Sequence, residues 1–485
     1  MLVIEKLPAT STKNRDPSEK VLIFRGSVSW DDKLKSDYIY INFHIPESVK
    51  CLEISYTYPE NSGCTLDIGL LGPGGVFRGW SGSNKKQIHL SPESATPGYL
   101  RGPIDPGEWS IMLGLAKIPR NGYCPYQVII KAQDCEGLAQ HNPGIQCTAP
   151  KKRAKPPENW LKGDLHVHSV HSDGMGTICD IALDAVRQGL DYIAITDHNT
   201  ISHHEELEIV GRGIGRENLI LIPGVEITTY YGHLNVWGEG WIDFRRGPRE
   251  LGSLVQAAHE KGLVISANHP FRDLGDLCIG CALADKSIRG FDAVEVWNGP
   301  WHAFGNREAL YWWHTMLCEG LRAAAIGGSD YHGRRDSVIR VGEPTTWIKP
   351  SSGTPKGLIE AIKLGRTYVT ASPKGPRIDI TLARGSTETY SIGDTVAVED
   401  RGENLKLVIE IQGVELEAIL KLITAEGVIH TQIIRGGDNK FVKDIILSKE
   451  HGFLRAELGI FSDPYSVMLK NGDIMIALTS PIYLR

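Results

Sequence analysis

From Leu161 onward, short apolar runs alternate with segments of helical spacing, and this alternation limits the fold more than any other feature of the sequence. Seven apolar runs follow one another, at 161–167, 191–198, 219–227, 263–270, 291–299, 323–332 and 342–348. Several segments between them, such as CDIALDAVRQGL and LGSLVQAAHEKGL, have apolar residues at helical spacing. Strands and helices that alternate with short connections form βαβ units on a parallel sheet. Seven runs favour a barrel over an open sheet, with PKGLIEAIKLG and TYVTAS completing it near residue 375.

Apolar residues alternate with period two on both sides of this α/β segment, which indicates antiparallel strands with one buried face. The clearest sets are Ile39, Ile41, Phe43 and Ile45 before it, and Leu405, Leu407, Ile409 and Ile411 after it. The stretch CTAPKKRAKPPENW is rich in Pro and Lys, as a linker would be. We therefore expect an N-terminal β-sandwich at 1–146, a linker at 147–160, the barrel at 161–375 and a C-terminal β-sandwich at 376–485.

Composition narrows the function classes. The 485 residues are too many for one core, and 41% hydrophobic with 23% charged residues is typical of a globular protein. A net charge of −6 argues against a general surface for nucleic acids. The start of the chain lacks the apolar core of a secretory signal, and no window approaches a membrane span. We expect a cytoplasmic protein with a small-molecule substrate, no nucleic-acid partner, no membrane contact and an undefined oligomeric state.

The cysteines do not indicate a disulfide framework, because nine of them occur at scattered spacing. Cys278 and Cys281 form a lone CxxC motif. A thiolate zinc site normally takes four ligands, so we interpret this pair as structural.

Histidines are concentrated in the α/β segment, where 12 of the 17 lie between residues 161 and 335. Reacting groups of a (β/α) barrel sit where its strands end. Nine side chains at or beside the ends of apolar runs have the chemistry of metal ligands: His166, His168, Asp173, His198, Glu226, His233, His269, Asp330 and His332. His166 and His168 lie two apart, so on a strand they project from the same face.

A single His or Asp at a strand end is more often a hydrogen-bonded anchor than a ligand, because a buried polar group needs only one good partner. Nine such residues together are not explained as separate hydrogen-bonded anchors. Clustered carboxylates and imidazoles would repel or desolvate one another unless cations neutralised them. The sequence therefore predicts a metal centre.

The motifs HVHSVHSDG, ITDHN, GVEIT, GHLNV, NHP and GSDYH, in this order and spacing, resemble the metal-ligand motifs of the polymerase and histidinol phosphatase (PHP) domain superfamily. The chain is most similar to the CehA/McbA-like metallohydrolase subgroup, which includes carbaryl hydrolase. The resemblance covers about residues 161–375. It implies a distorted (β/α)7 barrel, hence an α/β fold flanked by the two sandwiches, and two or three metal ions.

The same resemblance implies how the ligands are grouped. One ion would lie among His166, His168, Glu226 and Asp330. Glu226 would bridge to a second ion at His233 and His269. Asp173, His198 and His332 would hold a third.

Imidazole and carboxylate ligands without Cys suit zinc, manganese or iron. A bridging carboxylate such as Glu226 places two ions so that a shared water becomes hydroxide, our expected nucleophile, and Asp330 belongs to the same reacting centre. Asp197 is expected to orient a neighbouring ligand rather than to bind an ion. His171 could protonate a leaving group or stabilise its loop. Arg272, which follows NHP, could hold an anionic substrate, because a guanidinium matches phosphate or carboxylate.

The sequence supports only weaker predictions for several other polar and aromatic residues. Arg334 and Arg335 follow the last motif and are weaker anion-binding candidates than Arg272. His203 and His204 are expected to face solvent. Of the tryptophans, Trp297 and Trp301 could wall an apolar part of the pocket, whereas Trp312 and Trp313 have helical spacing typical of packing.

The sequence thus predicts a metal-dependent hydrolase, with small phosphate mono- or diesters as the leading substrates. A carbamate or amide hydrolase is the alternative that the subgroup implies. A non-catalytic metal- or glycan-binding protein is a third hypothesis, although a complete set of ligand residues argues against it.

Overall fold

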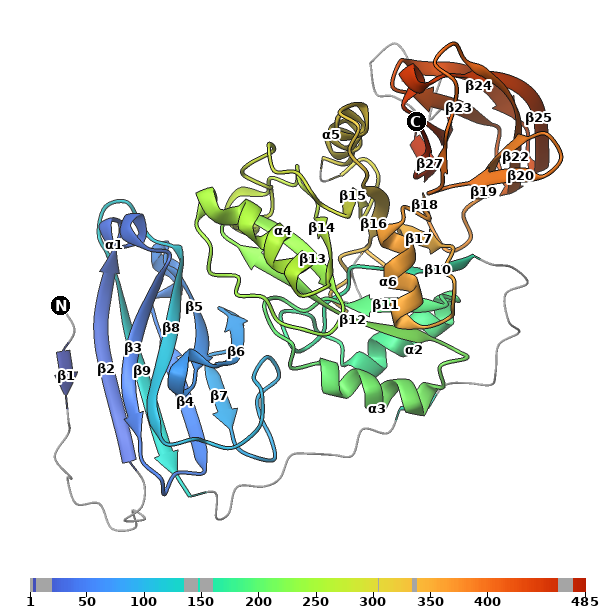
Figure 1. Cartoon of the computed structure of the whole chain (residues 1–485). Coiled ribbons are helices and arrows are strands. Elements are labelled where there is room, and N and C mark those ends of the chain that lie inside the picture. Colours follow the sequence, from blue (N-terminus) through green and yellow to red (C-terminus); the bar gives the residue numbers. More distant parts are fainter. Residues whose placement is uncertain are drawn as a thin grey trace.

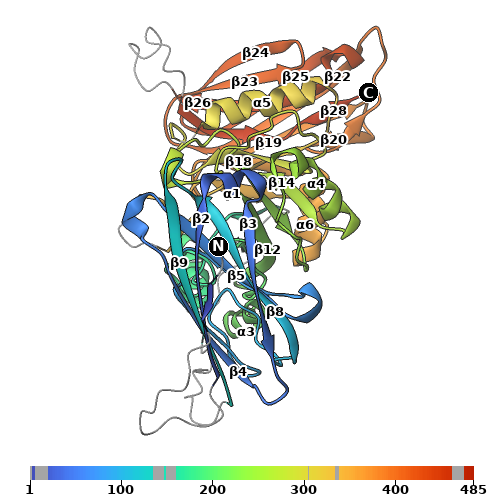
Figure 2. The same cartoon turned by 90° about the vertical axis from the view of Figure 1, so that its left-hand side faces the viewer.

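The computed structural model describes residues 3–5, 20–134, 147–148, 160–303, 305–333, 338–460 and 474–485. Three parts follow one another along the chain: an antiparallel β part, a mixed α/β part and a second β part (Figure 1). In Figure 2, turned by 90°, the first β part, in blue, lies in front of the α/β part. Most of the predicted linker lies outside the described residues, and so do Arg334 and Arg335.

The N-terminal part consists of two antiparallel sheets. One contains β1 (Val3–Glu5), β2 (Lys20–Ser29), β9 (Tyr123–Gln133), β4 (Cys51–Thr57) and β7 (Gln87–Leu90), in that order. The other contains β3 (Tyr38–Ile45), β8 (Gly107–Lys117), β5 (Thr65–Leu71) and β6 (Phe77–Gly82). Ile41, Phe43 and Ile45 of β3 are buried between the sheets, as their alternation predicts.

The second of these sheets is buried on its outer face as well. Tyr38, Trp80 and Met112 belong to the same apolar cluster as residues of the α/β part. The rings of Trp80 and Phe244 meet edge to face with centroids 4.8 Å apart, and Phe77 stacks on Trp241 at 4.3 Å. The sheet is therefore fixed against the α/β part through an apolar contact.

The α/β part is built on seven neighbouring strands. Their order is β16 (Ala324–Gly328), β15 (Ala293–Asn298), β14 (Val264–Ala267), β13 (Gly232–Trp237), β12 (Ile220–Thr229), β11 (Tyr192–Ile195) and β10 (Leu161–Asp164). A parallel bridge between Val167 and Tyr331 joins the residues that follow the two outer strands. The sheet is thereby curled, with the ends of β10 and β16 side by side.

This part departs from a regular (β/α)7 barrel. β12 and β13 form a hairpin and β13 is antiparallel to both neighbours, because Tyr230 and Tyr231 alone are too few to form a crossover. The seventh predicted run forms β17 (Thr345–Ile348), which pairs antiparallel with β10. The seventh predicted run is therefore antiparallel rather than parallel, and β13, which was not among the seven predicted runs, is an additional antiparallel strand.

Helices form in the α/β part, where the sequence predicted them, and one more forms at residues 30–35, where only strands were expected. They are α1 (Trp30–Lys35) in the N-terminal part and α2 (Ile178–Gln188), α3 (His204–Ile214), α4 (Leu251–Glu260), α5 (Asn306–Cys318) and α6 (Pro355–Lys363) in the α/β part. Five 3-10 helices are η1 (Glu60–Ser62), η2 (Pro73–Gly75), η3 (Pro248–Glu250), η4 (Gly275–Leu277) and η5 (Lys449–His451). In α2, Thr177 and Asp180 form a capping box, and Gly189 ends the helix at φ 75°.

The C-terminal part continues the sheet of the α/β part, because β18 (Thr367–Thr370) pairs with β17 and with β27 (Ile474–Thr479). From β27 the sheet runs through β26 (Phe453–Ile460), β23 (Ala418–Thr424) and β24 (Gly427–Ile434), with β28 (Ile482–Leu484) and β21 (Thr395–Val396) alongside. A separate sheet contains β20 (Glu388–Ser391), β19 (Arg377–Arg384), β22 (Glu403–Val414) and β25 (Gly437–Leu447). Leu405, Leu407, Ile409 and Ile411 are buried, as predicted.

Disulfides are present, contrary to the expectation from cysteine spacing. Cys147 is bonded to Cys179 of α2 across 32 residues, and Cys278 to Cys281. The first pair was missed because its members come together only when the segment before β10 packs on α2. Disulfides persist in oxidising compartments and are rare in the cytoplasm, so this pair does not favour the predicted cytoplasmic location. Within the part of the chain that the structure describes, no helix has the length and apolarity of a membrane span.

We predict that the double variant Cys147→Ser/Cys179→Ser unfolds with a free energy lower by about 3–4 kcal/mol, because the bond closes a loop of 32 residues in the unfolded chain. Denaturant titration followed by tryptophan fluorescence measures this difference. The exposed, unbonded Cys318 provides the control variant Cys318→Ser, which should match the parent. An unchanged midpoint in the double variant would show that the bond contributes nothing to stability.

Candidate metal centre

The nine predicted ligand residues lie together where strands of the curled sheet end. His166 and His168 directly follow β10, Glu226 lies in β12, and Asp330 follows β16. His166, His168, Glu226, His233, His269 and Asp330 are buried, whereas Asp173, His198 and His332 are half-buried. The cluster is therefore closed on one side and open on the side of the last three residues.

The first group surrounds the Nε2 atoms of His166 and His168, which lie 3.1 Å apart. Asp330 Oδ1 lies 3.5 Å from His166 Nε2 and 3.1 Å from His168 Nε2. Glu226 closes the group, with Oε1 3.3 Å from His166 Nε2 and Oε2 3.4 Å from His168 Nε2. Two nitrogens bound at ~2.0–2.1 Å to one tetrahedral ion lie about 3.4 Å apart, so the group has the spacing of a coordination shell.

The second group joins Glu226 to two further imidazoles. Glu226 Oε1 lies 3.2 Å from His269 Nε2 and 3.5 Å from His233 Nδ1. Among the described residues, the buried Nε2 of His233 has no hydrogen-bond partner. A buried imidazole nitrogen without a partner is costly unless it binds an ion, so this atom fits the role of a ligand.

The third group lies on the open side. Asp173 Oδ1 is 3.5 Å from His198 Nε2, and Asp173 Oδ2 is 3.3 Å from His332 Nε2. The ring of His168 stacks on those of His198 and His332, each at 4.4 Å between centroids. His168 thus borders this group as well as the first, a contact that the grouping from the sequence did not include.

Neighbouring charges shift the pKa values of the clustered imidazoles and carboxylates. Burial lowers the pKa of His166, but the carboxylates of Glu226, Glu295 and Asp330 outweigh it and raise that pKa well above its ordinary value. Burial likewise opposes ionisation of Glu226, yet His166, His198 and His233 hold its pKa well below the usual range. Without other cations, protonated imidazoles must balance these carboxylates. Divalent cations would take the place of those protons.

The backbone is strained at this cluster. The non-glycine residues with positive φ in the described part of the chain are Asn199 at 57°, His269 at 25° and Asp330 at 56°. All three lie within the cluster or next to His198. Residues rarely adopt this conformation unless the surroundings enforce it, and such strain concentrates at functional sites.

Several polar residues that orient the cluster escaped the sequence analysis. Glu295 lies in β15, where its Oε1 is 2.9 Å from His166 Nδ1 and its Oε2 accepts the backbone N–H of His269 at 2.8 Å. Asn268 donates to Glu226 Oε1 at 3.0 Å, and Asp164 Oδ1 accepts the N–H of His166 at 3.1 Å. A carboxylate inside an otherwise apolar strand, as in AVEVW, is the signal that could have identified Glu295.

Asp197 does not orient His198 as expected. Its Oδ1 accepts from Ser169 N at 2.8 Å and from Ser172 Oγ at 2.6 Å, and His203 Nδ1 lies 3.4 Å from its Oδ2. It therefore fixes the loop that carries His168 and Asp173. His203 is buried, with Nε2 3.0 Å from the carbonyl oxygen of Gly224, so the expectation that it faces solvent is wrong.

Two further candidates are Arg272, which contacts the cluster, and His171, which is held by other residues. Arg272 Nη1 donates to Asp330 Oδ2 and, at 3.0 Å, to Asn298 Oδ1. His171 is held by Ser202 Oγ at 2.8 Å and by Glu206 Oε2 at 3.0 Å. Both of its ring nitrogens are thus engaged, which favours the loop-stabilising interpretation over proton donation.

Other expectations for side chains of this part need correction. His204 is half-buried, with Nε2 3.2 Å from the carbonyl oxygen of Gly224, so it does not simply face solvent. Trp297 and Trp301 are buried in the apolar core together with Trp312 and Trp313, so they pack rather than wall a pocket.

Comparisons with known proteins agree with this geometry. Residues 164–278 match the model of the PHP domain. A 5'-3' exoribonuclease of Haemophilus influenzae is 43% identical over 96 residues, which are 20% of this chain and 34% of that protein. An uncharacterized protein of Methanocaldococcus jannaschii is 28% identical over 150 residues, which are 28% of this chain and 82% of that protein.

Among solved structures, a two-domain protein of Bacteroides vulgatus that contains a PHP-like metal-dependent phosphoesterase aligns with a TM-score of 0.37 and 19% identity, over 65% of this chain and 95% of that chain. Together with the clustered imidazoles and carboxylates, the family match supports the prediction of a metal-dependent hydrolase. Residues 164–278, which carry most of the motifs at the strand ends, are thus similar to the PHP domain.

Proposed function

We propose that this chain hydrolyses a small phosphate mono- or diester at a centre of two or three divalent ions. The observation that carries the proposal is the position of Glu226 Oε1, which lies 3.2–3.5 Å from imidazole nitrogens of His166, His233 and His269. One carboxylate between two sets of imidazoles is the arrangement of a bridging ligand.

The residues present fit two or three ions. His166, His168 and Asp330 would hold one, and His233 and His269 another, with Glu226 shared between them. Asp173, His198 and His332 would hold a third on the open side. Divalent ions supply Lewis acidity to such a site and lower the pKa of coordinated water.

The protein's own groups orient this centre. Glu295 fixes the ring of His166 through Nδ1 and leaves Nε2 directed at the cluster. Arg272 holds Asp330 and places a guanidinium at the edge of the cluster, where an anionic substrate oxygen would lie. Asp197 keeps the loop of His168 and Asp173 in place.

A phosphate ester is the substrate class that this arrangement serves best. Ions held by these residues would supply the positive charge that an in-line displacement at phosphorus requires. The Haemophilus influenzae relative, a 5'-3' exoribonuclease by name, supports this choice over the carbamate or amide alternative.

The first prediction from this proposed function concerns activity. The metal-loaded protein should hydrolyse p-nitrophenyl phosphate or bis(p-nitrophenyl) phosphate and leave an aryl carbamate intact. The variants His269→Ala and Asp330→Asn should each lower kcat/KM by roughly a hundredfold or more, because each removes a ligand from a shared centre.

The control is His44→Ala, since His44 is an exposed residue of the N-terminal part. It should retain the kcat/KM of the parent. Turnover of the carbamate alone would replace the proposed substrate class, and no turnover of any of the three compounds would favour a binding protein.

The second prediction concerns Glu295, which touches His166 but not the expected position of an ion. Glu295→Gln removes the negative charge that orients His166, so the affinity for Zn²⁺ or Mn²⁺ should fall by roughly 10–100-fold. Competition with a chromophoric chelator measures this affinity. Glu260→Gln, on the exposed end of α4, is the matched control. Equal affinities in the two variants would mean that Glu295 does not position a ligand.

A further inference from the structure

A cavity of about 360 Å³ lies between the N-terminal β part and the metal centre. Its walls include Thr65, Asp67 and Trp80 from β5 and β6, and His198, Thr228 and Tyr230 from the α/β part. Because His198 belongs to the half-buried third group, the cavity borders the open side of the cluster. We call it the interdomain pocket.

Hydrogen bonds and a ring contact join the N-terminal part to the α/β part around this pocket. Tyr230 Oη donates to Asp67 Oδ2 at 2.7 Å, and the ring of Tyr230 stacks on that of Tyr38 at 5.9 Å. Lys85, from the N-terminal part, donates to the carbonyl oxygen of Ser172 at 2.9 Å, in the loop that carries Asp173. The N-terminal part thus stands in a fixed position beside the metal centre.

Apart from His198 at its metal end, the pocket offers hydrogen-bond acceptors and hydroxyl groups rather than cations. Among the described residues that line it, the acidic ones are Asp67 and Asp276, and none is Lys or Arg. Ser81, Ser83 and Asn84 add neutral polar groups, and Trp80 adds an aromatic face. Carboxylates repel a phosphate group but accept hydrogen bonds from hydroxyls. The phosphate group of a substrate would therefore lie at the metal centre, and the pocket suits a neutral group with several hydroxyls.

Asp67 is the residue most able to select such a group. Its Oδ2 is engaged by Tyr230, while its Oδ1 accepts no hydrogen bond from the described residues. Burial raises the pKa of Asp67 to about 6, against the opposing effects of Tyr230, Lys33 and Lys86. Asp67 thus lines the pocket with a carboxylate oxygen that accepts no hydrogen bond from the described residues.

We propose that the interdomain pocket binds the alcohol portion of the substrate, that this portion is a sugar or another polyol, and that Asp67 determines the specificity for it. The proposal rests on the proposed phosphoesterase function, because it assumes that the phosphate lies at the metal centre. It assigns the N-terminal part a direct role in substrate choice.

The test compares ribose 5-phosphate with pentyl phosphate, which has the same chain length but no hydroxyls. The parent enzyme should have a kcat/KM for ribose 5-phosphate about tenfold or more above that for pentyl phosphate. A hydrogen bond to a charged group usually contributes enough free energy for such a ratio. Asp67→Asn should remove most of that preference while changing kcat/KM for pentyl phosphate less than about threefold. Asn84→Ala, on the exposed rim of the pocket, should lower the preference without affecting folding.

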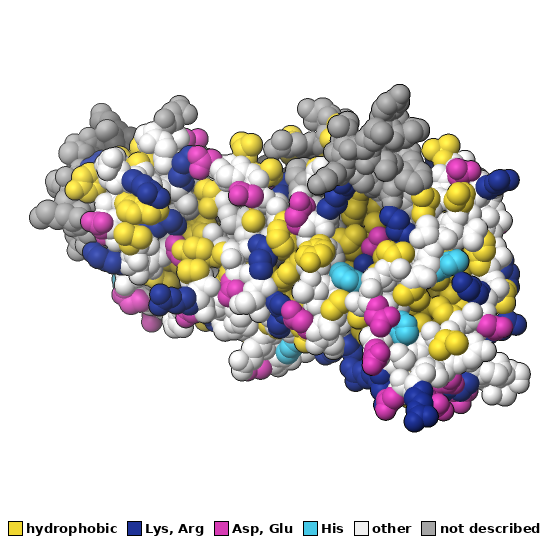
Figure 3. All heavy atoms as spheres, turned by 90° about the horizontal axis from the view of Figure 1, so that it is seen from above, with side chains coloured by type: hydrophobic (Ala, Val, Ile, Leu, Met, Phe, Trp, Pro, Cys, Tyr) yellow, Lys and Arg dark blue, Asp and Glu magenta, His cyan; other side chains and the backbone are white. Residues whose placement is uncertain are grey.

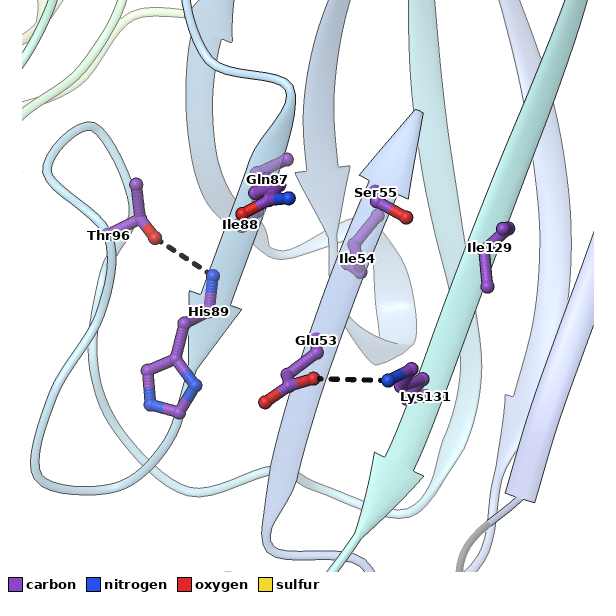
Figure 4. A pocket seen from close by; sticks show the side chains of 9 residues that line it. All are labelled: Glu53, Ile54, Ser55, Gln87, Ile88, His89, Thr96, Ile129 and Lys131. Atoms are coloured by element: carbon purple, nitrogen blue, oxygen red, sulfur yellow. Dashed lines mark hydrogen bonds and ion pairs between the residues drawn. The ribbon is translucent and has the colours of Figure 1, made fainter. Parts of the chain in front are cut away.

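The control uses a second hollow of the same N-terminal part, of about 420 Å³, on the outer face of β4, β7 and β9 (Figure 4). There Glu53 is paired with Lys131 at 3.9 Å, on the sheet that does not border the metal centre. Glu53→Gln should leave the preference for ribose 5-phosphate unchanged. Loss of the preference in this variant as well would mean that the effect is not specific to the interdomain pocket.

A binding measurement separates this proposal from the proposed function. Saturation-transfer NMR should detect methyl β-riboside on the parent protein and lose the signal in Asp67→Asn, whether or not any phosphate ester is hydrolysed. Riboside binding without phosphate-ester turnover would overturn the phosphoesterase function and keep the pocket. A riboside signal that survives Asp67→Asn, or an equal loss of kcat/KM for both esters, would overturn the role of Asp67.

Discussion

The structure depends on the balance of charge within one cluster of mostly buried carboxylates and imidazoles. Glu226, Asp330 and Asp173 lie among six imidazoles at distances of 3.0–3.9 Å, and most of these groups are buried. Buried carboxylates at this density are tolerated only when cations accompany them. Protons on His166, His198 and His332 can supply that charge, and divalent ions can supply it with better geometry. The strained backbone at His269 and Asp330 shows that the fold enforces the arrangement.

The fold serves this balance by bringing distant segments to one edge of a sheet. Parallel strands place the residues that follow them at the same edge, so His168, His198 and Asp330 meet although up to 162 positions separate them. The bridge between Val167 and Tyr331 then curls the sheet until both ends of the set face each other. Elsewhere, charges are dispersed: the face in Figure 3 mixes acidic and basic side chains, with few histidines among them.

The ligand positions could be predicted because each one lies at or beside the end of an apolar run, and the chemistry of His, Asp and Glu is visible in the sequence itself. Two features could not be predicted from local patterns: the hairpin between β12 and β13 depends on a turn of Tyr230 and Tyr231, and the disulfide of Cys147 joins segments that meet only after packing. Glu295 was overlooked, although a carboxylate inside an apolar strand is visible in the sequence. The pairing of β18 with β27 and the contact of Tyr230 with Asp67 likewise arise between separately predicted parts.

The central claim is that the clustered imidazoles and carboxylates bind divalent cations. Elemental analysis of the purified protein tests it most directly, because it measures the metal bound per chain. After dialysis against metal and then against metal-free buffer, the parent should retain about two to three equivalents of divalent metal. Glu226→Gln should retain at least one equivalent fewer, since it removes the shared carboxylate. A parent protein that keeps less than one equivalent, or a Glu226→Gln variant that keeps as much as the parent, would contradict the account.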